Sequence, residues 1–401
     1  MPRGIFRFVT ATLMLGAVLA SGPEARASSL VVDAETGKVI SADQPNHLWY
    51  PASLTKMMTV YVTLGEIEAG RLALEDKIKV STVAASATPV RFGLRAGEVI
   101  SVRQAINAAI VASANDAALA LAEKIGGTEE AFANLMTQTA WKLGMTRTIF
   151  RNATGLPDED QVTTAHDMAL LALAVLRDYP RHYALFNQRS VTIGGRSRPT
   201  VNGILGSYSG ADGLKTGFTC GSGYNLVASA QRSHRRVIAV LLGSMSRSQR
   251  TAEITRLLDS AFAGDLTGKL PLSTLMIAAA DEGAPPTVLT SAACNVQGDD
   301  ETLIAKTAHA GEWAIIFGSY VDKAKAQMAL SAAKATLGEL GGSARGVIAP
   351  KADSGVKQWA AMIVGLSQRR AGQACKTLWA KNSYCLALRP NVLADGSMAW
   401  R

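Results

Sequence analysis

Apolar residues lie almost all the way round one stretch near the start of the chain. Between Leu54 and Ala69 they recur at helical spacings, and Gly70 follows as a stop signal. A helix that is apolar on every side is normally buried inside a domain. The pattern therefore predicts a buried helix over 54–69, with the neighbouring elements packed around it.

Apolar periodicity elsewhere predicts an α+β domain. Short apolar runs bounded by turn residues predict strands at 30–33, 38–41, 224–230 and 237–242. Helical spacing predicts helices at 102–125, 128–145, 164–178 and 250–262. The polar sequence Ser113-Ala114-Asn115-Asp116 interrupts the first of these helical stretches. Since buried polar side chains need partners, we predict a break between two helices there, with Ser113 and Asn115 directed into a cleft.

Ser53 and Lys56 stand three residues apart at the start of the predicted buried helix. Backbone N–H groups at a helix start favour negative charge, and residue i+3 lies one turn away on the same face. Burial lowers the pKa of a lysine, and a neutral amine can take a proton from a serine. The pair alone is more often a helix cap beside a solvated lysine, so its significance depends on other motifs.

Two further motifs follow in order, Ser113-Ala114-Asn115 and Lys215-Thr216-Gly217. Ser-x-x-Lys, Ser-Asp-Asn and Lys-Thr-Gly together are the signature of class A β-lactamases and penicillin-binding proteins, and the middle motif here reads Ser-Ala-Asn. With Asn152-Ala-Thr-Gly-Leu-Pro157 and Val162-Thr-Thr-Ala-His166 added, residues 29–265 closely resemble the D-alanyl-D-alanine carboxypeptidases, the low-molecular-mass penicillin-binding proteins. This resemblance implies a β-lactamase-like transpeptidase fold.

The resemblance also implies a role for each motif residue. Ser53 would attack the carbonyl between two D-alanines and Lys56 would take its proton. Ser113 would relay a proton to the leaving amine, with Lys215 holding it oriented. Asn115 would hydrogen-bond the peptide backbone of the substrate.

The Lys-Thr-Gly motif is expected at the edge of a sheet, where Gly217 lets the substrate backbone approach closely. Thr216 and Lys215 would contact the terminal carboxylate of the substrate. The N–H of Phe218, opposite that of Ser53, would be an oxyanion donor. Arg250 is a weaker candidate for the carboxylate, because an arginine on a terminal helix is usually at the surface.

Several features limit the chemistry. Glu159 lies where a class A β-lactamase needs a deacylating glutamate, but the adjacent loop matches the carboxypeptidases, so β-lactams are expected to acylate Ser53 and leave slowly. The five histidines show no ligand spacing, and no metal or cofactor is expected. Cys220 and His166 depart from the usual family pattern, and Cys220 would be a free thiol near the cleft.

A second unit follows the first. Residues 266–308, rich in Ala, Thr and Pro, are predicted to be a linker. Residues 309–390 predict the order βαββαβ of a ferredoxin-like sandwich, followed by a tail at 391–401. Trp313, the turn Phe317-Gly-Ser-Tyr320, the helix beginning at Asp322, Val364-Gly-Leu366 and the pair Cys375 and Cys385 resemble a SPOR domain. That family binds peptidoglycan strands stripped of stem peptides.

Two points in this second unit remain open from the sequence. Cys375 and Cys385 could form a disulfide in an exported protein or remain two buried thiols. Trp359 and Tyr320 could stack on sugars, although packing in the core is the more common role.

Residues 1–27 have the form of a signal peptide, with Arg3 and Arg7 before an apolar run and Ala25-Arg-Ala27 as a cleavage site. The alternative is an uncleaved anchor. Export to the periplasm is expected, with enrichment at the division septum and contact with the cell-division machinery as further expectations. The net charge of +9 falls to +7 once the three arginines and one glutamate of this segment are removed. That charge suits anionic cell-wall polymer and does not cluster into a nucleic-acid patch.

These patterns leave three functions in competition. The first is a serine-type carboxypeptidase acting on peptidoglycan stem peptides, bound to glycan strands by its C-terminal unit and inhibited by β-lactams. The second is an endopeptidase that cuts cross-links with the same residues. The third is a catalytically idle glycan-binding scaffold, which the three intact motifs disfavour.

Overall fold

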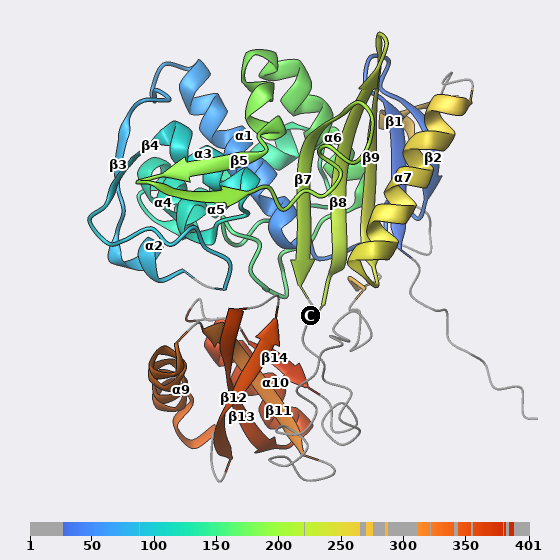
Figure 1. Ribbon diagram of the computed structural model, residues 1–401. Coiled ribbons are helices and arrows are strands. Elements are labelled where there is room, and N and C mark those ends of the chain that lie inside the picture. The colour runs from blue at the N-terminus through green and yellow to red at the C-terminus, as the bar shows by residue number, and fades with distance from the viewer. Residues whose placement is uncertain are drawn as a thin grey trace, which may run out of the picture.

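The computed structural model describes residues 27–87, 89–219, 221–264, 270–275, 285–287, 312–320, 322–340, 344–353, 356–379, 381 and 385–388. These residues form two units, each with its own sheet (Figure 1). The first 26 residues of the predicted signal peptide, Cys220 and the tail at 391–401 lie outside the described residues.

A six-stranded antiparallel sheet forms the frame of the first unit, in the order β10-β2-β1-β9-β8-β7. Its strands are β1 (Ser28–Asp33), β2 (Lys38–Asp43), β7 (Ala211–Thr219), β8 (Gly223–Arg232), β9 (Arg235–Ser244) and β10 (Leu270–Pro271). The strands predicted at 30–33, 38–41, 224–230 and 237–242 are confirmed as β1, β2, β8 and β9.

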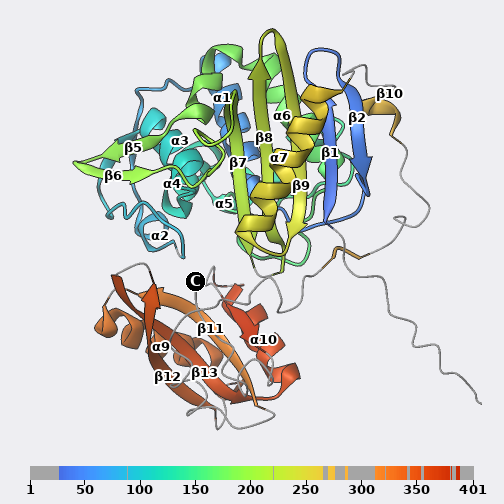
Figure 2. The same cartoon turned by 45° about the vertical axis from the view of Figure 1, so that its right-hand side comes forward.

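Each face of this sheet carries a separate apolar core, because side chains alternate along a strand. On β9, Val237, Ala239 and Leu241 pack with α7 (Arg247–Ala263). Ile238, Val240 and Leu242 join the larger core beneath the remaining helices. Figure 2 shows α7 alone across one face, with the helical mass behind the other.

Helix α1 (Thr55–Glu68) is the centre of that helical mass, and every residue from Thr55 to Leu64 is buried, as predicted. Its last turn differs from the prediction, because residues 65–67 are only partly buried and residue 68 is exposed. A short 3-10 turn, η1 (Ala52–Leu54), leads into it. The helices packed against it are α3 (Val102–Val111), α4 (Asn115–Gly126), α5 (Glu129–Lys142) and α6 (Ala165–Asp178). The same half of the unit also contains β3 (Lys77–Lys79), α2 (Thr82–Ser86), β4 (Val99–Ser101), η2 (Pro180–Asn187), β5 (Ser190–Ile193) and β6 (Arg196–Pro199). The gap between α3 and α4, residues 112–114, confirms the predicted break between two helices, and Asn115 is the first residue of α4.

The described part of the second unit runs β11 (Trp313–Tyr320), α9 (Lys323–Leu337), η6 (Gly338–Leu340), β12 (Arg345–Asp353), β13 (Val356–Leu366), α10 (Gln368–Trp379) and β14 (Leu386–Leu388). Its antiparallel sheet has the order β12-β13-β11-β14. Both helices pack with the sheet in one apolar core. The element order is the predicted βαββαβ, and Cys375 and Cys385 form a disulfide.

Part of the stretch predicted as a linker belongs to the first unit. Strand β10 pairs with β2, and η3 (Leu272–Thr274) follows it with the Leu272 side chain buried. His166, the departure noted in the sequence, has Nε2 3.2 Å from the Leu272 carbonyl oxygen. Residues 270–275 therefore complete the sheet edge, because Leu272 fills the core there. Within the described residues, no helix combines the length and the apolar character needed to cross a membrane.

Candidate active site

Ser53 is the middle residue of η1, the short 3-10 turn that leads directly into α1. Ala52, just before it, has φ of +50°, a left-handed conformation that non-glycine residues rarely adopt. The turn is held from the sheet, because Asn225 Nδ2 donates to the carbonyl oxygens of Tyr50 at 3.0 Å and Pro51 at 3.3 Å. Strained backbone that is held by surrounding contacts is frequent at catalytic residues.

Lys56 is fully buried and points back at Ser53. Its Nζ lies 3.1 Å from Ser53 Oγ and donates to Asn115 Oδ1 at 2.7 Å and to the Thr154 carbonyl oxygen at 2.5 Å. Burial lowers the pKa of Lys56 to about 7, against smaller opposing effects of Asp116 and Glu129. An amine with this pKa is neutral in a large fraction of molecules at neutral pH and can accept the Ser53 proton.

The loop after residue 151 supplies one of these contacts, and sequence reasoning assigned it no role in the site. Asn152 Oδ1 accepts from the N–H groups of Thr154 at 3.2 Å and Gly155 at 2.7 Å, which turns the Thr154 carbonyl toward Lys56. A Cβ on Gly155 would lie 1.9 Å from the Ala52 carbonyl oxygen. The motif Asn-Ala-Thr-Gly was visible in the sequence, but its contact with the turn around Ser53 was not.

Ser113 occupies the break between α3 and α4, with φ of +56° and its side chain buried. Lys215 on β7 donates from Nζ to Ser113 Oγ at 2.9 Å and to the Thr216 carbonyl oxygen at 2.8 Å. The pKa of Lys215 is lowered well below its usual value, first by burial and then by Lys56 and Arg250. The three motifs therefore meet through two lysines, each next to one serine.

Asn115 and Gly217 have contacts beyond those predicted. The Asn115 side chain accepts a hydrogen bond from the Lys56 amine, so it also helps to position the candidate base. Strand β7 is the edge of the sheet, as predicted, but the Cβ position of Gly217 faces the turn around Ser53. An added Cβ would lie 2.8 Å from the Pro51 carbonyl oxygen and 3.2 Å from the nitrogen of Ser53. The absence of a side chain at Gly217 thus lets β7 approach the Ser53 turn itself.

The remaining candidate residues are Thr216 and Phe218 on β7 and Arg250 on α7. The ring of Phe218 is 41% exposed and stacks on Tyr224 at a centroid distance of 4.2 Å. Arg250 is only 5% exposed, so a surface location for it is wrong. Burial, followed by the charge of Arg247, lowers its pKa to about 10. Within the described residues no acidic side chain pairs with Arg250, and its Nε has no hydrogen-bond partner. A buried, unpaired guanidinium is suited to an anionic ligand.

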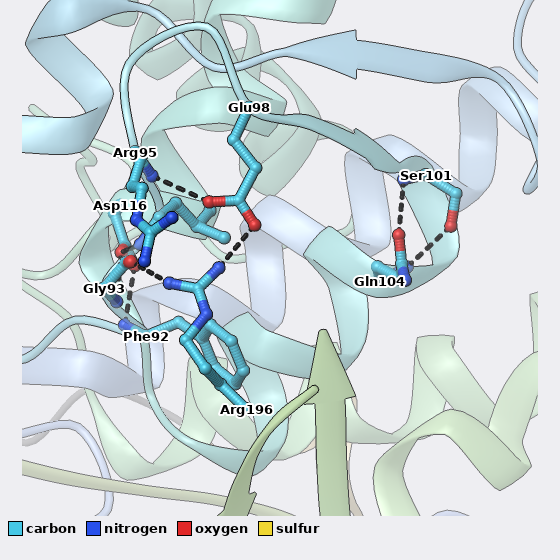
Figure 3. A network of polar contacts seen from close by, with 9 residues as sticks. Phe92, Gly93, Arg95, Glu98, Ser101, Gln104, Asp116 and Arg196 are labelled. Atoms are coloured by element: carbon cyan, nitrogen blue, oxygen red, sulfur yellow. Dashed lines mark hydrogen bonds and ion pairs between the residues drawn. The ribbon is translucent and has the colours of Figure 1, made fainter. Parts of the chain in front are cut away.

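A polar network behind the second motif fixes residues 90–98 against α4 (Figure 3). The buried Asp116 carboxylate accepts from the N–H groups of Phe92 at 2.9 Å, Gly93 at 2.8 Å and Leu94 at 2.9 Å. Arg196 on β6 donates to the Gly93 carbonyl oxygen and to Glu98 from the other side. Asp116 was visible only as part of a polar cluster, since Phe92, Gly93 and Leu94 lie more than twenty residues away in the sequence.

Comparison with known proteins identifies the family of the first unit. The profile described as D-alanyl-D-alanine carboxypeptidase, peptidase S11, matches residues 17–246, more than half of the chain. D-alanyl-D-alanine carboxypeptidase DacC of Escherichia coli is 38% identical over 240 residues, which are 58% of this chain and 60% of that protein. The D-alanyl-D-alanine endopeptidase of Escherichia coli is 32% identical over 257 residues, 60% of this chain and 79% of that protein.

A solved structure agrees with these relatives. Penicillin binding protein 5 from Haemophilus influenzae superimposes with a TM-score of 0.58 at 33% identity, covering 61% of this chain and 72% of that one. The chain spans 60–63% of the length of the first curated relatives that it matches.

Proposed function

The chain belongs to the D-alanyl-D-alanine carboxypeptidase family, and on that premise we propose that it is a serine-type hydrolase that removes the terminal D-alanine from peptidoglycan pentapeptide stems. One observation carries the proposal. A fully buried lysine with a pKa of about 7 lies 3.1 Å from the hydroxyl of a serine at a strained turn. This is the arrangement that nucleophilic catalysis by serine requires.

Acylation begins when Lys56 accepts the proton of Ser53 and Ser53 Oγ attacks the carbonyl carbon between the two D-alanines. The negative charge that develops on the carbonyl oxygen is stabilised by the N–H groups of Ser53 and Phe218. The close approach of β7 to the Ser53 turn at Gly217 supports this placement. Removing one such donor typically costs about 10²–10³ in rate.

The leaving D-alanine departs as an amine and needs a proton. Ser113 is next to Lys215 at 2.9 Å and relays this proton, while Asn115 contacts the substrate backbone. Thr216, Lys215 and Arg250 bind the terminal carboxylate, which the buried and unpaired guanidinium of Arg250 supports. Water then hydrolyses the acyl-enzyme and restores Ser53. No metal or cofactor takes part in this proposal.

The direct test is release of D-alanine by residues 28–401 from a pentapeptide ending in D-Ala-D-Ala. Release that disappears in Ser53→Ala, with circular dichroism unchanged, is the expected result. A fluorescent penicillin should acylate the wild-type chain and be released slowly, and it should fail to label Ser53→Ala. Labelling that persists in this variant would refute the nucleophile assignment. Penicillin labelling without D-alanine release would favour the idle scaffold.

One comparison favours a second candidate activity, the cleavage of peptide cross-links. The matched part of the Escherichia coli D-alanyl-D-alanine endopeptidase covers 79% of that protein, so the same unit occurs in an enzyme named for a different leaving group. Cleavage of a cross-linked muropeptide by residues 28–401, run beside the pentapeptide, measures this activity. Cleavage of both substrates would show both activities, and cleavage of the pentapeptide alone would show a carboxypeptidase.

The second unit is proposed to be a SPOR-like domain that holds the enzyme on stripped glycan strands. Support comes from its βαββαβ order. Tyr320 and Trp359 are cross-strand neighbours that pack against the apolar core of this unit, the more common of the two roles considered for them, and they stay partly exposed. The whole protein would then act in the periplasm and gather at the septum beside the division machinery. Deleting 309–401 should abolish co-sedimentation with stripped glycan and septal enrichment while sparing D-alanine release. Midcell enrichment that survives the deletion would contradict this role.

A further inference from the structure

Lys56 has two hydrogen-bond acceptors besides Ser53, and a carboxylate fixes the backbone next to each of them. The first acceptor is Asn115 Oδ1, and Asn115 directly precedes Asp116 in the first turn of α4. The second acceptor is the carbonyl oxygen of Thr154. The N–H of the preceding residue, Ala153, donates to Glu129 Oε1 at 3.0 Å.

Asp116 fastens the first turn of α4 to the chain at 90–94. Its side chain is 0% exposed, and its oxygens accept four backbone N–H groups, those of Phe92, Gly93, Leu94 and Ala117. The N–H of Asn115 adds a further bond to the Val90 carbonyl oxygen at 2.8 Å. These contacts keep Asn115 from rotating away from Lys56.

Glu129 does the same for the other acceptor from α5. The peptide groups of Ala153 are held on both sides, because its N–H donates to Glu129 and its carbonyl oxygen accepts from Thr59 Oγ1 at 2.7 Å. Thr59 is one turn beyond Lys56 on α1. The carbonyl of Thr154 is therefore fixed relative to the helix that carries the base.

We infer that Asp116 and Glu129 are positioning residues for Lys56: each fixes one acceptor of its amine, and each places a negative charge near an otherwise desolvated cation. The inference rests on the proposed function in one respect, namely that Lys56 is the base. It adds two residues that touch neither the substrate nor Ser53.

The electrostatic part has a definite sign. Burial lowers the pKa of Lys56 to about 7, and Asp116 and Glu129 both act to raise it. The other charged group coupled to this amine is Lys215, whose own pKa is depressed by burial, Lys56 and Arg250. Burial raises the pKa of Glu129 and the charge of Glu123 adds to this rise, while the N–H of Ala153 and the charge of Lys56 oppose it. Removing either carboxylate charge should lower the pKa of Lys56 further.

Two near-isosteric variants, Asp116→Asn and Glu129→Gln, test this in the full chain. The measured quantity is the rate constant for acylation of Ser53 by a fluorescent penicillin, from pH 5 to pH 9. The acid limb of the wild-type profile should lie near pH 7 and move to lower pH in both variants. For a movement of about one unit, the rate at pH 6 becomes about fivefold larger as a fraction of its plateau. Glu130→Gln is the matched control, because Glu130 is also in the first turn of α5 but is exposed.

A third variant separates the two effects of Glu129, namely its hydrogen bond with the Ala153 N–H and its negative charge near Lys56. Glu129→Gln keeps an oxygen for the Ala153 N–H, whereas Glu129→Ala removes it. The plateau rate should fall at least about tenfold in Glu129→Ala and remain within about threefold of wild type in Glu129→Gln, since a misplaced reacting group costs far more than a lost charge above the pKa. Equal plateau rates in the two variants would show that the hydrogen bond between Ala153 and Glu129 does not position the Thr154 carbonyl.

The remaining outcomes are distinct. If wild type is acylated but the acid limb stays in place in both charge variants, the inference is wrong and the proposed function stands. If only Asp116→Asn moves the limb, the part concerning Glu129 is overturned. If Asp116→Asn does not fold, Glu129→Gln still decides the charge effect. If wild type is not acylated at all, the proposed function itself fails.

Discussion

Replacing Gly155 with alanine should slow acylation of Ser53 by displacing the turn that carries Ser53. Gly155 has φ of +82°, and a Cβ there would lie 1.9 Å from the Ala52 carbonyl oxygen and 2.3 Å from its carbon. Ordinary van der Waals contact begins near 3.4 Å, so the two backbones must separate by about 1.5 Å. Ala52 directly precedes Ser53, the proposed nucleophile, and Thr154 directly precedes Gly155. The shift therefore moves Ser53 or an acceptor of Lys56.

The expected loss has two parts. A left-handed alanine costs roughly 1–2 kcal/mol of folding free energy. A displacement of about 1 Å at a reacting group can cost about 10² in rate. We therefore expect acylation of Gly155→Ala by a fluorescent penicillin to be at least about 100-fold slower than wild type, with a measurable decrease in unfolding free energy.

Gly127→Ala is the matched control. Gly127 follows α4 with φ of +74°, but no atom lies within 4 Å of its Cβ position. It should show the backbone cost alone, with acylation unchanged. Wild-type acylation rates in a folded Gly155→Ala protein would refute the argument that this contact sets the position of Ser53.

Three further predictions concern other parts of the molecule. Acylation by the wild-type chain should fall about tenfold for each pH unit below 7, because only the neutral Lys56 amine accepts a proton; a rate independent of pH between 5 and 7 would exclude Lys56 as the base. Arg250→Ala should raise KM for a peptide with a free C-terminal carboxylate far more than for its amide, while Arg247→Ala on the same helix should affect neither. Replacing Cys375 and Cys385 by serine should lower the unfolding free energy of the second unit by about 2–3 kcal/mol, measured in denaturant, without changing acylation. An unchanged unfolding midpoint would show that the ten-residue loop needs no covalent constraint.

Several features of the fold follow from local sequence alone. The apolar stretch after Ser53 is a buried helix, and the polar residues at 113–115 interrupt the long helix that surrounds them. The edge position of Lys215 and the βαββαβ order at 312–388 were also predicted. These features depend on periodicity and on the placement of polar residues within a few turns, which one stretch of chain determines by itself.

The candidate residues Ser53, Lys56, Ser113 and Lys215 were likewise predictable, because their spacing forms an ordered set of motifs. What the sequence left undecided is the environment of each. Arg250 looked like a surface residue and is buried, and Gly217 faces the Ser53 turn as well as the cleft edge. Asp116 and Glu129 carried no signal as partners of Lys56.

The sequence by itself determined which residues are candidates for the proposed chemistry, since residue type and spacing indicate a nucleophile, a base and an edge strand. Only the tertiary structure lowers the pKa of Lys56 to about 7, the value that the proposed base needs at neutral pH. The pKa of Lys56 depends on complete burial and on acceptors from residues 59 and 98 positions away. Desolvation and electrostatic interactions act through space, so a lysine becomes a base only when distant segments of the chain have closed around it.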